Sequence, residues 1–413
     1  MDSMDSHSTS QPGAGSDRPS LINWELAAST AARLAPAGPV LSGAQISAAV
    51  SDLRTMADRS VPYVHDITGL EAARDLRDSQ VLIVDRASWA RANTQSFAVL
   101  MESTLEQLAR KQAAEMKSSS LALGGTVTGT QLGAVLAFLS SKVLGQYDPF
   151  AALGPQGPNG TQGGQDGTSA AQGTAAGGRL LLVAPNIIAV ERELNVEPSD
   201  FRLWVCLHEQ THRVQFAAAP WLRHHMLSEI EKLSGLLVGD AENLSDRVAA
   251  ALRSLTGKAG ARLGRAGSDD GGARQKGAAG SDASPRRGGL LDLFQDPQEK
   301  AALSHLTAVM SLLEGHANVV MDAVDASIVP TVKTIRQRFN ARSKDRGAVE
   351  KFIRNLMGLD AKMRQYSDGA RFVRAVVART GMSGFNNVWT AQDHLPTEQE
   401  IHNPDLWVER MGL

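Results

Sequence analysis

The segment LWVCLHEQTHRVQFAAAPWL, residues 203–222, decides how the rest of this chain is interpreted. It contains two histidines four residues apart, His208 and His212, and Glu209 directly follows the first. A spacing of four residues places both imidazoles on one side of an α-helix, one turn apart. Two imidazoles in this arrangement can bind a single metal ion. The pattern therefore predicts a helix that carries part of a metal site.

The sequence around this motif is typical of a helix that packs against a core. Apolar residues that include Phe201 and Val205 lie on the same face as the two histidines. Ser199 and Asp200 come just before them. Either side chain is expected to cap the helix by accepting a hydrogen bond from a free N–H group of its first turn. The sequence therefore predicts a capped helix that runs to about Phe216.

Glu209 is the candidate general base. On a helix it is rotated by about 100° from His208, so its carboxylate flanks an ion held by the histidines without binding it. In hydrolytic metal sites the ion acidifies a water molecule, and a neighbouring carboxylate takes the proton. Cys206 lies almost opposite His208 and is expected to be a buried apolar residue rather than a ligand.

A catalytic zinc site usually has three protein ligands and one open position, so the two histidines are an incomplete set. The extended pattern HExxHxxGxxH would need glycine and histidine where this chain has Gln215 and Ala218. His224 and His225 follow at the wrong spacing and are expected to lie at the surface or around the site. The third ligand must come from another part of the chain.

The best source of a third ligand is HLTAVMSLLEGHANVVMDAVDASIV, residues 305–329, whose apolar residues recur at helical steps. Glu314 is a candidate because a buried carboxylate must be paired or bind a metal. Glu314 and His316 are about 200° apart around a helix, so only one can face the ion, and their spacing leaves the choice open. Glycine is unfavourable inside a helix, so Gly315 is expected to allow another backbone or substrate to come close.

Outside these two segments the pattern is mostly helical, as in ISAAVSDLRTMADRSV at residues 46–61. Two short apolar runs differ from it, QVLIVDR at residues 80–86 and RLLLVAP at residues 179–185. Both are typical of buried strands, which could pair with each other. The expected fold class is therefore mainly α with a small β element (α+β).

Composition suggests how the chain is divided. Residues 1–20 are polar and are expected to form a disordered tail, and residues 21–413 to form one domain. Two glycine-rich tracts, at about 154–178 and 257–289, are too poor in apolar residues to order themselves by burial. Both are expected to be flexible insertions in that domain.

Charge and cysteine content exclude some classes of partner. The formal net charge is −2 over 413 residues, which gives no sign of a nucleic-acid partner. One cysteine allows no internal disulfide, and the N-terminus lacks a secretion signal, so a cytoplasmic location is expected. The most apolar segment, residues 121–145, contains several glycines, serines and threonines and also Lys142. It is expected to be a buried helix hairpin rather than a stable membrane insertion.

Four segments together resemble the actinobacterial zincin-like, zinc-dependent metallopeptidase family, long known as a domain of unknown function. They are DFRLWVCLHEQTHRVQFAAAPWLR, LLEGHANVVMDAV, KVLGQYDPF and FNNVWTAQDHLPTEQEIHNPDLWVERM. The resemblance runs from about INWELAASTAARLAPAGP to the end of the chain and excludes the tail and both glycine-rich tracts. It implies a zincin-like fold that binds Zn²⁺, with the HExxH motif on an active-site helix and the third ligand on a second long helix.

The resemblance also distinguishes the two candidates for the third ligand. Zincins of the glutamate type use a downstream Glu-x-x-x-Asp, in which the Asp supports a ligand histidine. By this resemblance Glu314 is the ligand, and Asn318 occupies the supporting position. The Asn318 amide can orient an imidazole but raises its basicity less than a carboxylate does. His316 is then a neighbour of the site rather than a ligand.

The predicted function is that of a zinc metallopeptidase, in which Glu209 activates water for the cleavage of peptide bonds. Tyr366 and His394 are candidates for a donor that stabilises the oxyanion. Two alternatives stay open: a zinc-binding regulatory module without catalysis, and a metal-dependent hydrolase of small amides or esters. A free strand edge near the zinc, formed by residues 179–185, would favour peptides.

Overall fold

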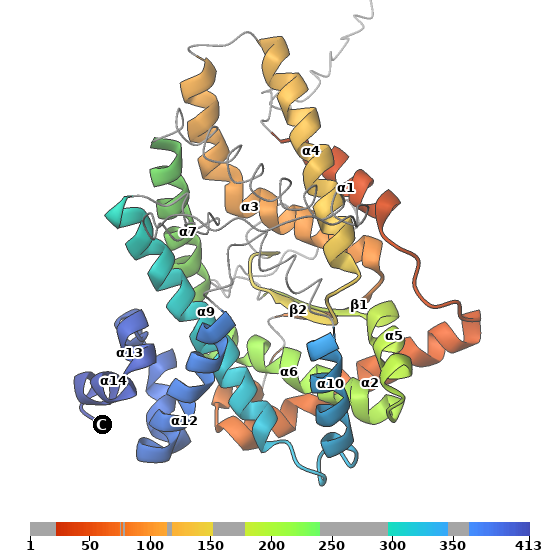
Figure 1. Ribbon diagram of the computed structural model, residues 1–413, viewed down its shortest axis with the longest axis vertical. Coiled ribbons are helices and arrows are strands. Elements are labelled where there is room, and N and C mark those ends of the chain that lie inside the picture. The colour runs from red at the N-terminus through yellow and green to blue at the C-terminus, as the bar shows by residue number, and fades with distance from the viewer. Residues whose placement is uncertain are drawn as a thin grey trace, which may run out of the picture.

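The computed structural model describes residues 22–74, 76, 79–113, 118–151, 178–239, 296–345 and 363–413. The predicted tail and most of both glycine-rich tracts lie outside these residues. Within the described part of the chain, helices surround one small sheet (Figure 1). The predicted fold class, mainly α with a small β element, is therefore confirmed.

The longer helices come in two groups, one before and one after the second glycine-rich tract. The first group is α1 (Trp24–Leu34), α2 (Gly43–Thr68), α3 (Arg86–Ala113), α4 (Ser118–Ser140), α5 (Ala184–Leu194), α6 (Pro198–Ala218) and α7 (Leu222–Gly239). The second group is α9 (Pro297–Ala323), α10 (Val332–Asp345), α12 (Met363–Phe385), α13 (Glu398–His402) and α14 (Pro404–Met411). Short 3-10 turns are η1 (Glu71–Arg74), η4 (Asn386–Trp389) and η5 (Gln392–His394).

The sheet has three strands in the order β1–β3–β2. The strands are β1 (Gln80–Val84), β2 (Gly145–Asp148) and β3 (Arg179–Val183). β1 and β3 pair in parallel, so both predicted strands are confirmed and they pair with each other. β2 pairs antiparallel with the other side of β3. The strand in residues 179–185 is therefore central and does not form the free edge that would favour peptides.

β3 is apolar because it is buried on both faces, as in other strands covered by helices on either side. Leu180 and Leu182 belong to the main core. Leu181 and Val183 belong to a second cluster with residues of α1, α3 and α4. Figure 1 accordingly shows the sheet with α3 and α4 above it and α6 and α2 below it. This arrangement places α6 directly against the sheet.

The apolar segment at residues 121–145 does not form the predicted hairpin. Residues Ser118–Ser140 make one continuous helix, α4, and the chain then enters β2. Two of its glycines let α4 pack closely against α1 and do not form a turn. A Cβ atom on Gly129 would lie 2.6 Å from the carbonyl oxygen of Asn23, just before α1, and one on Gly133 would lie 2.6 Å from that of Ala27 in α1. Among the described residues, no helix combines the length and the apolar character needed to cross a membrane.

Helix α6 begins two or three residues earlier than expected from a cap at Ser199 or Asp200, and neither residue caps it. Its first residue is Pro198, whose fixed φ suits this position and whose missing N–H group needs no partner. Asp200 lies in the first turn and instead accepts hydrogen bonds from the N–H and hydroxyl groups of Thr331, at 2.8 and 2.7 Å. This contact connects the start of α6 to the segment before α10.

Helices α9 and α12 cross at two glycines. A Cβ atom on Gly315 would lie 2.3 Å from the carbonyl carbon of Gly369, and one on Gly369 would lie 1.9 Å from the carbonyl oxygen of Ser311. The two backbones are therefore in direct contact, as expected for Gly315. Because Gly315 adjoins Glu314, the crossing also fixes the position of that carboxylate.

A Gly315→Ala variant should lose about 1–3 kcal/mol of folding free energy, the usual cost of overpacking. The added methyl group meets backbone atoms of α12, which cannot rotate away as a side chain would. Urea denaturation measures the loss. Gly43→Ala is the control, because a Cβ atom there meets nothing within 4 Å. Equal midpoints for the two variants would contradict the role assigned to the crossing.

Candidate metal centre

Three side chains from two helices converge beside the sheet. His208 and His212 lie on α6, and Glu314 lies on α9. Their ligand atoms are all within 4.8 Å of one another. The Nε2 atom of His208 is 3.9 Å from one carboxylate oxygen of Glu314, and that of His212 is 3.6 Å from the other. The side chains are 30%, 14% and 31% exposed, so the cluster is open to solvent on one side.

A buried glutamine fixes the orientation of His212. The Gln215 amide donates to the Leu313 carbonyl at 2.8 Å, so its oxygen must face the other way. That oxygen lies 3.0 Å from Nδ1 of His212 and can only accept. Nδ1 of His212 therefore carries the proton, and the lone pair of Nε2 points to Glu314. Neither the motif nor its spacing indicates this role for Gln215, because Leu313 lies 98 positions further along the chain.

Glu209 is buried next to the ligand cluster, with 7% of its surface exposed. A Cβ atom on Gly145 of β2 would lie 2.5 Å from Cγ of Glu209, so only glycine lets the strand come this close. Burial, and next the charge of Glu314, raise the pKa of Glu209 to about 8. A bound cation would offset the charge of Glu314. The carboxylate is therefore held against the edge of the sheet with a strong affinity for a proton.

The family model for zincin-like metallopeptidases matches residues 22–408. The chain belongs to this family. It is also similar to a crystal structure described as a putative hydrolase with a novel fold from Chloroflexus aurantiacus. The two chains share 27% sequence identity with a TM-score of 0.60, over 95% of this chain and 99% of the other. A comparison with curated proteins finds no match.

Membership of the zincin-like family implies a metal ion, and the residues present suit one. Two imidazole nitrogens and one carboxylate oxygen form the donor set of many catalytic zinc sites. Burial, and next the proximity of His212, lower the pKa of His208 to about 3, so its imidazole is neutral at pH 7. Neutral imidazole is the form that binds metals.

His316 lies behind the cluster rather than in it. Its side chain is fully buried and stacks on Phe385 at a ring distance of 5.3 Å. Its Nδ1 atom is 3.0 Å from the Gln215 amide nitrogen, from which it accepts. Burial, and next His212, lower the pKa of His316 to about 3. The chain of contacts from His212 through Gln215 to His316 therefore joins α6 to α9.

The structure differs from the expected support by Asn318. That residue is exposed on α9, and the proton on Nδ1 of His212 is donated to Gln215 instead. The side chain of Tyr366 lies outside the described residues. His394 donates from Nδ1 to the Asn387 carbonyl at 2.9 Å, within the segment from η4 to η5.

Cys206 is part of the core, as its position on the helix predicts. The side chain is fully buried, and Sγ lies 4.0 Å from the Leu53 carbonyl of α2. Burial, and next the charge of Glu209, raise the pKa of the thiol far above its ordinary value. A thiol of this kind is neither a nucleophile nor a ligand at neutral pH.

Proposed function

We propose that this chain is a zinc-dependent metallopeptidase that cleaves peptide bonds. His208, His212 and Glu314 hold the ion, and Glu209 is the general base. The observation that carries the proposal is the convergence of three ligand atoms within 4.8 Å, with a buried carboxylate on the same helix beside them. The family match and the similarity to a putative hydrolase support it.

Each residue of the site has a separate role in the proposed hydrolysis. When bound, zinc acts as a Lewis acid that acidifies water and polarises a carbonyl group. Glu209 takes the proton from the attacking water and delivers it to the leaving amine. Burial raises the proton affinity of Glu209 above that of an exposed carboxylate, which favours its role as the group that accepts and returns the proton. Gln215 keeps His212 in the tautomer that leaves Nε2 free for the ion.

The edge of the sheet supports a peptide as substrate. The Val183 N–H group donates to the Leu144 carbonyl at 2.8 Å, which makes these residues a hydrogen-bonded pair of the β2–β3 ladder. Such pairs alternate in antiparallel strands, so the N–H and C=O groups of Gly145 point away from β3. Gly145 also contacts Glu209. An extended peptide that pairs with this edge would thus place its backbone beside the general base.

Digestion of a mixed peptide library, followed by mass spectrometry, tests this function. We expect cleavage within peptides, its loss after treatment with a zinc chelator, and its recovery when Zn²⁺ is returned. A panel of small amides and esters is assayed in parallel. Turnover of the panel alone would indicate a small-molecule hydrolase. Bound zinc without turnover of either set would indicate a regulatory module.

A further inference from the structure

A second pair of histidines lies outside the proposed zinc site, in a pocket where α7, α9 and η5 meet. The cavity has a volume of about 550 Å³. Every residue that lines it carries a polar group able to bind a metal; they are His225, Glu229, His305, Gln392 and Asp393. His225 and Glu229 lie on α7, one helical turn apart, and His305 lies on α9.

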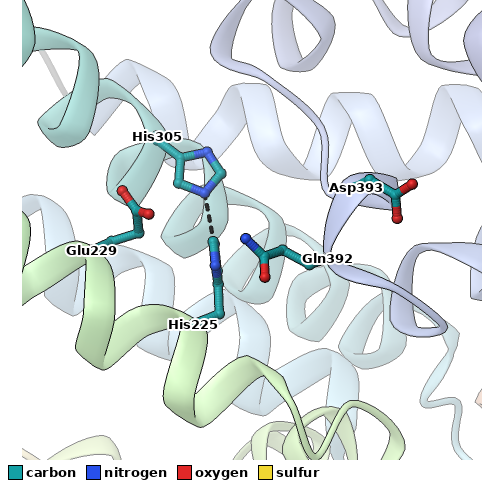
Figure 2. Close-up of a pocket in the computed structure, with 5 residues that line it drawn as sticks. All are labelled: His225, Glu229, His305, Gln392 and Asp393. Atoms are coloured by element: carbon teal, nitrogen blue, oxygen red, sulfur yellow. Dashed lines mark hydrogen bonds between the residues drawn. The ribbon is translucent and has the colours of Figure 1, made fainter.

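The two imidazoles have nearly the same relative geometry as those in the proposed zinc site. The ring centroids of His225 and His305 are 5.0 Å apart, with 83° between the ring planes. The corresponding values for His208 and His212 are 5.0 Å and 86°. In the second pair the Nε2 atoms face each other at 2.7 Å (Figure 2). At most one proton fits between two nitrogens at this distance, so at least one of them presents a lone pair.

The surroundings of the pair combine nitrogen and oxygen donors on three elements. His225 is buried, with 7% of its surface exposed, and its ring also lies edge-on to Trp221 at a centroid distance of 6.1 Å. Imidazole nitrogens together with carboxylate and amide oxygens form a donor set suited to divalent transition metals.

We propose that this pocket binds a divalent transition-metal ion such as Zn²⁺, with Nε2 of His225 and of His305 as its first two ligands. Glu229 and Gln392 supply oxygens from either side of the pair. In Figure 2 they flank the two rings, whereas the Asp393 carboxylate points away from them. The ion takes the place of the direct contact between the imidazoles, which move apart slightly to admit it.

Glu229 must move to reach this ion. As placed, its carboxylate does not form a three-ligand group with the two histidines within 4.8 Å. It instead accepts from Lys232 at 2.6 Å. The Lys232 side chain is 61% exposed and that of Glu229 is 11% exposed, so the ammonium group can turn to solvent while the carboxylate stays in the pocket. A rotation of Glu229 towards the histidines exchanges the contact with Lys232 for one with the ion.

The second ion is distinct from the first. His305 precedes Glu314 by nine residues on α9, which corresponds to roughly 13 Å along the helix axis. This separation is too large for one ion to bind both residues. The second ion would connect α7, α9 and η5, and would thus stabilise the helix that carries Glu314 without taking part in the reaction.

Zinc stoichiometry of the full chain tests the proposal. We expect two equivalents of Zn²⁺ after equilibrium dialysis at micromolar free zinc, and one in each of His208→Ala and His305→Gln. The double variant should bind none. In the His208→Ala background, Zn²⁺ should raise Tm, and this shift should disappear when His305→Gln is added. His224→Gln is the control, because His224 is exposed beside the pair and should leave both equivalents in place.

A single equivalent in the unsubstituted protein, with none in His208→Ala, would overturn the second site. The histidine pair would then be an N–H···N hydrogen bond only. The one equivalent left in His208→Ala reports on this pocket alone, so failure of the proposed function and failure of this inference are distinguishable. Glu229→Gln provides a second variant in the pocket. It should weaken zinc binding in the His208→Ala background, and unchanged affinity would exclude Glu229 as a ligand.

Discussion

Replacing Glu209 with glutamine is expected to lower kcat for peptide cleavage by a factor of about 10²–10⁴, the usual contribution of a general base. Glutamine has nearly the same shape as glutamate, so it can occupy the space beside Gly145. It cannot take a proton from water. Because Glu209 is not among the three converging ligands, the zinc content should stay unchanged. Kinetics and metal analysis on the same preparation measure both quantities.

Glu197→Gln is the matched control for this experiment. Glu197 precedes α6 and is exposed, so the same chemical change there removes no group near the ligands. Its kcat and zinc content should equal those of the unsubstituted protein. Turnover that survives Glu209→Gln would exclude Glu209 as the base. Zinc loss in that variant would show that Glu209 supports the site rather than the proton transfer.

The sequence predicts the two helices of the site because each leaves a local pattern. The spacing of four between His208 and His212 identifies one face of α6, and the apolar steps of residues 305–329 identify α9. The glycine at 315 indicates a close approach, which the contact with Gly369 confirms. All of these signals lie within one or two helical turns, where periodicity is informative.

The contacts between elements could not be predicted in the same way. Gln215 is the residue that orients His212, yet its partners on α9 are about a hundred positions away in the sequence. A glutamine three residues after a histidine carries no signal of such a role. The general pattern of the family suggested Asn318 instead, which is exposed. Only the packing of α6 against α9 distinguishes the two residues.

The third strand was missed for a related reason. β2 has four residues and includes Gly145 and Asp148, both of which are uncommon in strands. Asp148 is stabilised there by Arg179 of β3 at 3.0 Å, and that contact depends on the antiparallel pairing itself. Short strands of this kind depend on their neighbours rather than on their own residues. The edge strand beside Glu209 is therefore β2, and residues 179–185 lie in the centre of the sheet.

Glu314→Gln is expected to lose one equivalent of zinc relative to the unsubstituted protein, and peptide cleavage should be lost with it. The amide has no negative charge and is a weaker ligand than the carboxylate that lies 3.6 Å from His212 and 3.9 Å from His208. Loss of an outer-shell partner already weakens metal affinity by about 10–100-fold, so loss of a direct ligand should weaken it more. Competition with a coloured zinc chelator measures the change.

Comparing His316→Gln with Glu314→Gln shows which of the two residues is the metal ligand, because Glu314 and His316 lie on different sides of α9. His316 contacts the Gln215 amide and not the converging ligand atoms, so this variant should keep its zinc. Its affinity should fall by about 10–100-fold, as for other outer-shell partners. Circular dichroism checks that both variants fold. If His316→Gln lost the ion and Glu314→Gln kept it, the third ligand would be His316, and α9 would have to rotate to present it.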